Sequence, residues 1–167
     1  MSDRKLITVF GATGAQGGGL ARSILADPDG PFAVRAVTRD TASPAAKALA
    51  KAGAEVVAAD VDDAAAVARA LDGAYGAYFV TFFWAHFSPL KELAEARIMA
   101  QAARNARLKH AIWSTLEDTR RRVPLSDNRM PTLMEKYKVP HFDAKGEADQ
   151  FFRDAGVPTT FLLTSFY

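Results

Sequence analysis

Short apolar runs alternate along this chain with longer segments in which apolar residues recur every three or four positions. Leu6–Phe10 is the first apolar run and predicts a strand. After a glycine-rich turn, Leu20, Ile24 and Leu25 are spaced as on one face of a helix. We expect this helix to end near Ala26, before a cluster of Asp, Pro and Gly. The chain therefore begins with a strand, a turn and a helix.

The same alternation continues along the rest of the chain. The predicted strands are Leu6–Phe10, Phe32–Thr38, Glu55–Ala59, Tyr75–Val80, His110–Ser114 and a sixth that begins at Thr159. After the first helix, the predicted helices cover Ser43–Leu49, Asp63–Leu71, Leu90–Arg107 and Pro140–Ala155. This order predicts an α/β fold, a doubly wound parallel sheet of the Rossmann type with strand order 3-2-1-4-5-6. We expect one domain, residues 1–167.

One segment breaks the alternation. Thr115–Val139 has no clean period and carries two prolines and the triplet Arg120–Arg122. A long irregular segment inside a compact domain is typically functional or mobile. The triplet fits either an acidic partner or phosphate, or a solvated, mobile loop, and we favour the solvated loop.

Composition narrows the classes of partner and compartment. Hydrophobic residues make up 49% of the chain, and the net charge is only +2, which does not suggest nucleic-acid binding. The absence of cysteine excludes disulfides, a thiol nucleophile and cysteine-ligated zinc. The first strand begins too early for a signal peptide, and no apolar run approaches the roughly 20 residues of a membrane span. We expect a cytoplasmic protein, with the nucleus as a second compartment.

The glycine turn has the chemistry of a dinucleotide site. Gly11 allows a tight turn, Gly14 lets the backbone approach phosphates, and Gly17 lets the helix pack on the strand. The N-terminus of the following helix offers N–H groups and a positive dipole end to an anion. Thr13 and Gln16 add side-chain contacts at the mouth of the site. The alternative is that the glycines serve the turn alone.

The end of the second predicted strand bears on the choice between NAD and NADP. An acid about 20 residues beyond the glycine turn would bind the ribose 2′-hydroxyl of NAD. Here Arg39 precedes Asp40. A guanidinium pairs bidentately with a phosphate, so Arg39 favours the 2′-phosphate of NADP, whereas Asp40 is the competing signal for NAD. The third interpretation is an Arg39–Asp40 ion pair on the surface.

Carboxylates and aromatic residues follow the next two strands. Asp60, Asp62 and Asp63 suggest metal or acid–base chemistry only weakly, and we favour a helix cap with one carboxylate near the adenine amino group. Thr81 leaves the carboxyl end of the fourth strand, where open α/β sheets bind ligands, and is expected near the ribose next to the nicotinamide. The aromatic residues after Thr81 fit either a lid or a core or dimer surface.

His141 and Lys145 lie four residues apart and therefore share one face of a predicted helix. In short-chain dehydrogenases a Tyr and a Lys have this spacing, with the Tyr hydroxyl as general acid. A histidine can donate a proton but does not reproduce a phenolate. Ser114 ends the fifth strand, where a supporting hydroxyl would lie. The alternative is that both residues are ordinary exposed helix positions.

Four segments together resemble the NmrA-like family, whose members are atypical relatives of the short-chain dehydrogenases. They are Val9–Gly17, Val37–Arg39, Gly53–Val57 and His141–Glu147. The resemblance covers nearly the whole chain. It implies a Rossmann domain that binds NADP(H) and acts as a redox sensor or regulator through protein partners, with a homodimer as a further expectation. Apart from this resemblance, we expect no metal, because no histidine is near Asp60, Asp62 and Asp63 in the sequence.

The resemblance assigns roles by matched position. The pyrophosphate would lie on Gly11, Thr13, Gly14, Ala15, Gln16 and Gly17, the 2′-phosphate on Arg39, and adenine near Asp62 and Asp63. The ribose and nicotinamide would meet Thr81, Phe82 and Phe83, and the Lys145 side chain would donate to the nicotinamide ribose. Catalysis, if present, would use Lys145 or His141.

Two other functions stay open at this point. The first is an NADPH-dependent reductase of a small quinone or enone, and the second is a module that binds a transcription regulator and holds its cofactor structurally. Family members continue beyond the sixth strand, whereas this chain ends at Phe166–Tyr167. We therefore expect a truncated product or fragment that lacks the C-terminal subdomain of the family.

Overall fold

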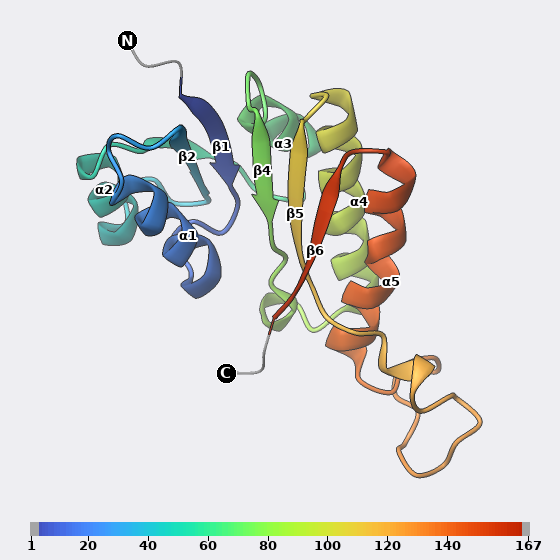
Figure 1. The fold of residues 1–167 in the computed structure, drawn as a ribbon. Coiled ribbons are helices and arrows are strands. Elements are labelled where there is room, and N and C mark those ends of the chain that lie inside the picture. Colours follow the sequence, from blue (N-terminus) through green and yellow to red (C-terminus); the bar gives the residue numbers. More distant parts are fainter. Residues whose placement is uncertain (1–3, 165–167) are drawn as a thin grey trace.

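The computed structural model describes residues 4–164 and contains a six-stranded parallel sheet in the order β3-β2-β1-β4-β5-β6 (Figure 1). The strands are β1 (Lys5–Val9), β2 (Phe32–Thr38), β3 (Glu55–Ala58), β4 (Gly76–Phe79), β5 (His110–Thr115) and β6 (Thr159–Leu163). The helices are α1 (Ala15–Leu25), α2 (Pro44–Lys51), α3 (Ala64–Ala70), α4 (Pro89–Asn105) and α5 (Pro140–Ala155). Short 3-10 turns, η1 (Phe83–Ala85) and η2 (Thr119–Arg121), follow β4 and β5. The predicted fold class and strand order are confirmed.

Helix ends follow the local chemistry of the sequence. The Ser43 hydroxyl accepts the Ala46 N–H and begins α2, with Pro44 in the first turn. The Asp63 carboxylate does the same for α3. Gly156 ends α5 with a φ of 69°, in the left-handed region that glycine adopts without steric cost. Predicted strand ends differ from the structure by at most one residue, as expected where pairing with a neighbour decides the last residue.

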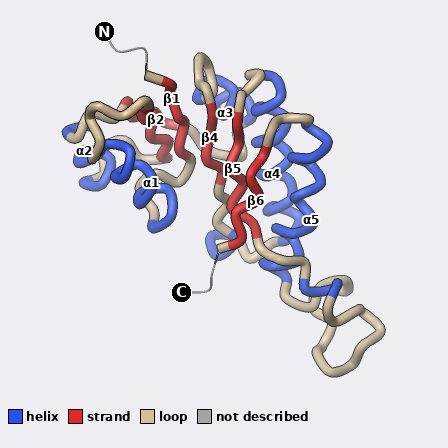
Figure 2. Tube along the Cα trace, viewed as in Figure 1, coloured by secondary structure: helices blue, strands red, loops and turns tan. Residues whose placement is uncertain are grey.

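The helices cover both faces of the sheet (Figure 2). One apolar cluster packs α1 and α2 against β1 and β2, with Ala21 and Leu49 among its buried residues. The other joins α3, α4 and α5 to the opposite face. There Trp113 stacks on Phe152 with ring centroids 4.8 Å apart. Within residues 4–164, no helix is long and apolar enough to cross a membrane.

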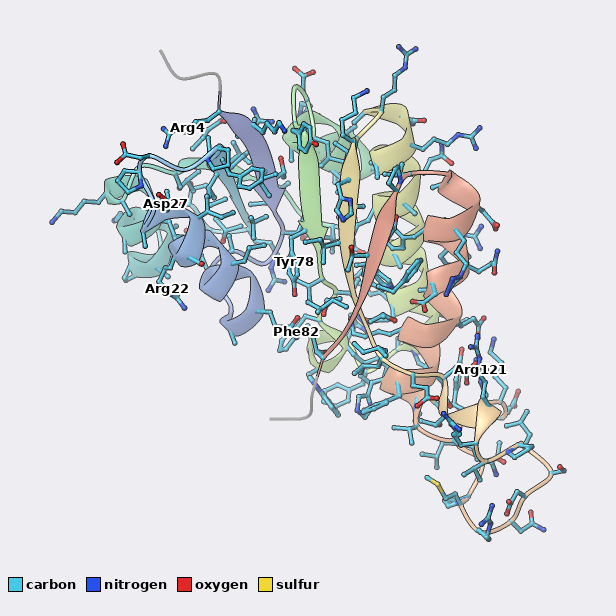
Figure 3. All side chains as sticks on the ribbon, viewed as in Figure 1. Arg4, Arg22, Asp27, Tyr78, Phe82 and Arg121 are labelled. Carbon is cyan, nitrogen blue, oxygen red and sulfur yellow. The ribbon has the colours of Figure 1, made fainter. Side chains whose placement is uncertain are left out.

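The segment between β5 and α5 projects from the body of the protein, with Arg121 near its base (Figure 3). Buried charges fix its ends. The buried Lys138 ammonium donates to the carbonyl oxygens of Asp127 and Met130, both at 2.8 Å. Arg120 pairs with Asp118 at 2.8 Å and Glu147 at 3.1 Å. The prediction of a solvated, mobile arginine triplet is therefore wrong for Arg120, because the nearby Asp118 and the distant Glu147 both hold its guanidinium.

Candidate functional site

A crevice of about 840 Å³ opens at the carboxyl ends of the central strands, where β1 lies between β2 and β4. At this point of a doubly wound sheet, the connections after neighbouring strands lead to opposite faces of the sheet. The loops therefore diverge and leave space for a ligand. The predicted site residues that line it are Gly11, Thr13, Gly14, Ala15, Gln16, Gly17, Arg39, Asp62, Thr81, Phe82, Phe83, His141 and Lys145. Asp63 does not line the crevice. Its carboxylate accepts the N–H groups of Ala65 and Ala66 instead, which corrects its predicted place near adenine.

The glycine turn brings α1 unusually close to β1. Gly11 has a φ of 63°. A Cβ on Gly17 would lie 2.6 Å from the carbonyl oxygens of both Phe10 and Gly11. Among the described residues no side chain caps α1 at Gly14, and no acid lies in its first turn. The first N–H groups of α1 therefore face the crevice with the positive end of the helix dipole, as an anion such as pyrophosphate requires.

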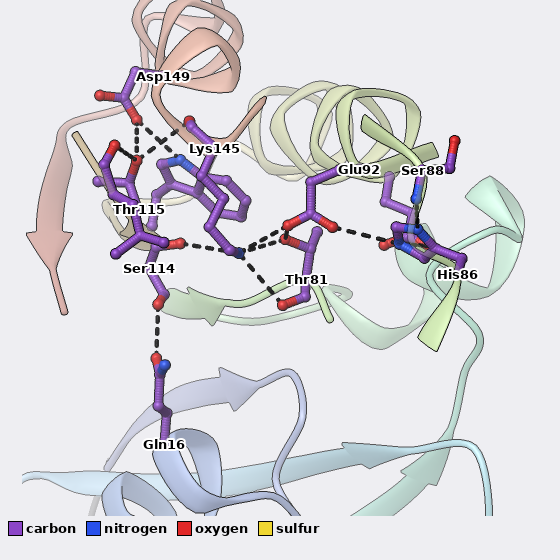
Figure 4. A network of polar contacts seen from close by, with 12 residues as sticks. Gln16, Thr81, His86, Ser88, Glu92, Ser114, Thr115, Lys145 and Asp149 are labelled. Carbon is purple, nitrogen blue, oxygen red and sulfur yellow. Dashed lines mark hydrogen bonds and ion pairs between the residues drawn. The ribbon is translucent and has the colours of Figure 1, made fainter. Parts of the chain in front are cut away.

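Gln16 connects this turn to the two neighbouring strands. Its Oε1 accepts the Tyr78 hydroxyl at 2.5 Å and the Ser114 hydroxyl at 2.6 Å. Gln16 thereby bridges the N-terminus of α1 to β4 and β5. Ser114 thus lies at the end of β5 as expected, but its hydroxyl bonds Gln16 and not a residue of α5 (Figure 4).

Arg39 and Asp40 play separate roles after β2. The Asp40 carboxylate accepts the Ala42 N–H at 2.8 Å and so belongs to the turn before α2. Within residues 4–164 Arg39 forms no ion pair, and its side chain lines the crevice. The predicted alternative of an Arg39–Asp40 surface pair is wrong. Arg39 is therefore the residue of this pair whose charged group is available to bind a ligand.

The aspartate turn after β3 lines the other side of the crevice through Asp60 and Asp62. The Asp62 carboxylate pairs with the Lys91 ammonium of α4 at 2.6 Å. Both side chains are about half exposed, at 49% and 42%. This ion pair crosses from the β3–α3 turn to α4, so it borders the end of the crevice where the adenine is expected.

Lys145 is almost fully buried, which excludes its interpretation as an ordinary exposed helix residue. Its ammonium donates to Thr81 Oγ1 at 2.6 Å, Glu92 Oε1 at 3.0 Å and the carbonyl oxygens of Thr81 and Ser114 at 3.3 and 3.5 Å (Figure 4). Burial lowers the pKa of Lys145, and the Glu92 carboxylate opposes that change. The ammonium hydrogens are thus directed at protein oxygens.

Two buried acids of α4, Glu92 and Glu95, are the site residues that our sequence analysis missed. They lie in phase with the buried Ala96 and Met99 on the face of α4 that enters the core. Acids on the apolar stripe of a helix were the available signal. Thr81 donates its hydroxyl to Glu92. Burial first, and then the neighbouring Glu92, raises the pKa of Glu95 to about 7.

His86, Glu92 and Glu95 have ligand atoms close enough to hold a metal ion. Their hydrogen bonding does not fit one. His86 Nδ1 accepts the Ser88 N–H at 3.0 Å, so the neutral ring carries its proton on Nε2. A metal bound to Nε2 would need the lone pair of that nitrogen, so the ring proton would have to be on Nδ1. There it would face the Ser88 N–H, and two donors would oppose each other. His86 Nε2 therefore points a hydrogen toward Glu92 at 3.4 Å and Glu95 at 3.7 Å.

His141 lies among aromatic rings at the start of α5. Its ring is 4.7 Å from Trp84 and 5.7 Å from Phe83, measured between centroids. Burial lowers the pKa of His141, which favours a neutral ring. Phe82 and Trp84 are 63% and 49% exposed at the mouth of the crevice. We call residues 82–88, which carry these rings and His86, the aromatic loop.

Comparison with known proteins places this geometry in a family. The model of the NmrA-like family matches residues 3–167. The chain belongs to the NmrA-like family. One curated relative is the NmrA-like family domain-containing oxidoreductase lnaB of Aspergillus flavus, 35% identical over 144 residues, which are 81% of this chain and 42% of the relative. The chain spans less than half the length of the curated relatives it matches.

Solved structures of this family share the fold. NmrA, a negative transcriptional regulator solved with NADP, is 25% identical with a TM-score of 0.76 over 95% of this chain and 44% of NmrA. NmrA has also been solved with NAD. An NADPH-dependent quinone oxidoreductase from Escherichia coli is 25% identical with a TM-score of 0.65, over 96% of this chain and 48% of its own. The chain thus has the NAD(P)-binding Rossmann fold of these proteins.

Proposed function

We propose that this chain binds NADP(H) in the crevice and acts as a redox-dependent regulator, with the aromatic loop presenting the cofactor state to a protein partner. Within residues 4–164, the cofactor is supported by the N-terminus of α1, which no side chain caps, and by Arg39 at the end of β2, which forms no ion pair. It is also supported by NmrA and its bound NADP. When bound, the cofactor would supply hydride chemistry, and its pyrophosphate and 2′-phosphate would supply the negative charge.

The observation that carries the regulatory role is the state of the acid–base groups. Most of the residues predicted to hold the cofactor line one crevice, yet the Lys145 hydrogens are directed at Thr81, Glu92 and Ser114. His141 replaces the tyrosine and lies against Trp84 and Phe83. Efficient proton donation needs a group within hydrogen-bond reach of the reacting atom. A site that binds the cofactor but keeps the proton donors Lys145 and His141 engaged with other protein groups suits sensing better than turnover.

Calorimetry with NADPH, NADP and NADH tests the proposal. We expect NADPH and NADP to bind and NADH to bind at least about tenfold more weakly, because only the first two offer a 2′-phosphate to Arg39. A partner captured by the NADPH-loaded protein should be released when NADP replaces NADPH. Equal affinities for NADH and NADPH would overturn the assignment of Arg39. A partner that ignores the NADPH to NADP ratio would overturn the regulatory role.

A second candidate is an NADPH-dependent reductase of a small quinone or enone. It is favoured by the Lys145 ammonium, which lines the crevice, and by the names of the curated relatives, which are oxidoreductases. Here Lys145 would give up one protein acceptor and donate a proton to the reduced substrate. Steady NADPH oxidation with a panel of quinones and enones would support this function. Turnover that persists unchanged in Lys145→Ala would exclude the role of Lys145.

A further inference from the structure

One buried carboxylate joins three separate parts of the site. Glu92 Oε1 receives the Lys145 ammonium from α5 and the Thr81 hydroxyl from the end of β4. Glu92 Oε2 faces His86 Nε2 of the aromatic loop at 3.4 Å. The side chain of Glu92 is fully buried. It is therefore the common contact of the cofactor crevice and the loop (Figure 4).

The two oxygens of Glu92 are differently satisfied. Oε1 has two strong donors, whereas Oε2 has no aligned hydrogen bond among the described residues, and neither does His86 Nε2. A buried acceptor without a well-formed bond is costly. A small movement of the loop that aligned His86 Nε2 with Oε2 would form this hydrogen bond and lower the free energy. Oε1, in contrast, is held at its present position by Lys145 and Thr81.

We propose that Glu92 is a positioning residue that couples occupancy of the crevice to the position of the aromatic loop. The proposal rests on the proposed binding of NADP(H). Lys145 can donate to a ligand oxygen only by weakening a bond to one of its protein acceptors, since four oxygens already share its three hydrogens. The Glu92 carboxylate then turns toward His86, and the distance from His86 Nε2 to Oε2 shortens. This movement draws the aromatic loop toward α4.

Within residues 4–164 no hydrogen bond or ion pair joins Lys145 to His86 directly, whereas the Glu92 carboxylate contacts both. Trp84 and Phe83 move with the same loop, because their rings pack on each other at 5.6 Å and Phe83 packs on His86 at 5.8 Å. The exposed rings at the crevice mouth would therefore change position when Lys145 acquires a ligand. This is the surface that the proposed partner would sense.

Imidazole NMR tests the coupling directly, because the chain has only three histidines. The ring signal of His86, assigned with His86→Asn, should shift when NADP is added to the wild-type protein. Glu92→Gln preserves the shape and removes the charge. We expect it to keep NADP binding and to lose the His86 shift, because the charge for which Lys145 and His86 compete is gone.

Asp149→Asn is the matched control. It is also an acid-to-amide change at a partly buried carboxylate, which accepts the Trp113 indole N–H at 3.1 Å, and it lies outside the crevice. It should keep both the affinity and the His86 shift. If Glu92→Gln fails to fold, the double variant Glu92→Gln with Lys145→Met removes both buried charges together, which proteins tolerate better than an unpaired charge. That variant should fold and lose the shift.

The outcomes separate this inference from the proposed function. Absence of NADP binding by the wild-type protein would overturn the proposed function. Binding without a His86 shift, or a His86 shift that persists in a folded Glu92→Gln or double variant, would overturn the coupling alone. An equal loss in Asp149→Asn would also overturn it, because the effect would then be general to acid-to-amide changes in this part of the protein.

Discussion

Replacing Gly17 with alanine tests the close packing of α1 on β1 that shapes the crevice. The added Cβ would lie 2.6 Å from the carbonyl oxygens of Phe10 and Gly11. Comfortable non-bonded contacts begin near 3.5 Å, so α1 would have to move away from β1 by about 0.9 Å. These obstacles are backbone atoms and cannot rotate aside. Overpacking of this kind costs about 1–3 kcal/mol.

Gly19→Ala supplies the reference on the same helix. A Cβ at Gly19 meets no atom within 4 Å, so this variant keeps the gain of about 0.8–1 kcal/mol that alanine has over glycine in a helix. Gly17→Ala has the same gain, which cancels when the two variants are compared. The difference in their unfolding free energies should therefore equal the steric cost alone, about 1–3 kcal/mol, with Gly17→Ala the less stable.

Urea unfolding followed by circular dichroism measures both free energies by linear extrapolation. Gly17→Ala should also bind NADPH more weakly, because the N–H groups of the first turn of α1 move with the helix. Equal stability of Gly17→Ala and Gly19→Ala would show that α1 does not lie against β1 as described. The proposed position of the first turn of α1 in the crevice would then be wrong as well.

Three further predictions address other parts of the chain. Arg39→Ala should cost about 1.5–3 kcal/mol of NADPH binding and leave NADH binding unchanged in calorimetry, while Arg69→Ala, 72% exposed, changes neither. The pKa of Glu95 is raised from 4.5 to about 7, so the folded state holds this proton more tightly and stability is lost as pH rises through that range. The stability advantage of Glu95→Gln over wild type should thus grow from about pH 5 to pH 8, and a constant difference would contradict the shift. Asp143 is fully buried and accepts the N–H groups of Thr119, Lys138 and Val139. Asp143→Ala should therefore cost at least about 2 kcal/mol of unfolding free energy, whereas the exposed Asp154→Ala stays within about 0.5 kcal/mol.

Some of the candidate site was already readable from the chain order. The glycine turn, Arg39 and Thr81 each follow a predicted strand, and the carboxyl ends of parallel strands meet at one edge of a sheet. Asp63 was misplaced because a carboxylate before a helix can either cap it or face a ligand, and the local sequence is the same in both cases. Only the direction of the side chain distinguishes them.

By itself, the sequence determined the alternation of strands and helices, their caps and the glycine turn, because these depend on hydrophobic period and on the bonding of neighbouring residues. Only the tertiary structure decided that Lys145 is enclosed by Thr81, 64 residues away, and by Glu92. The same holds for Arg120, which is fixed by Glu147 of α5. Burial and charge pairing are properties of the packed chain, since they arise when distant segments exclude water from the same volume.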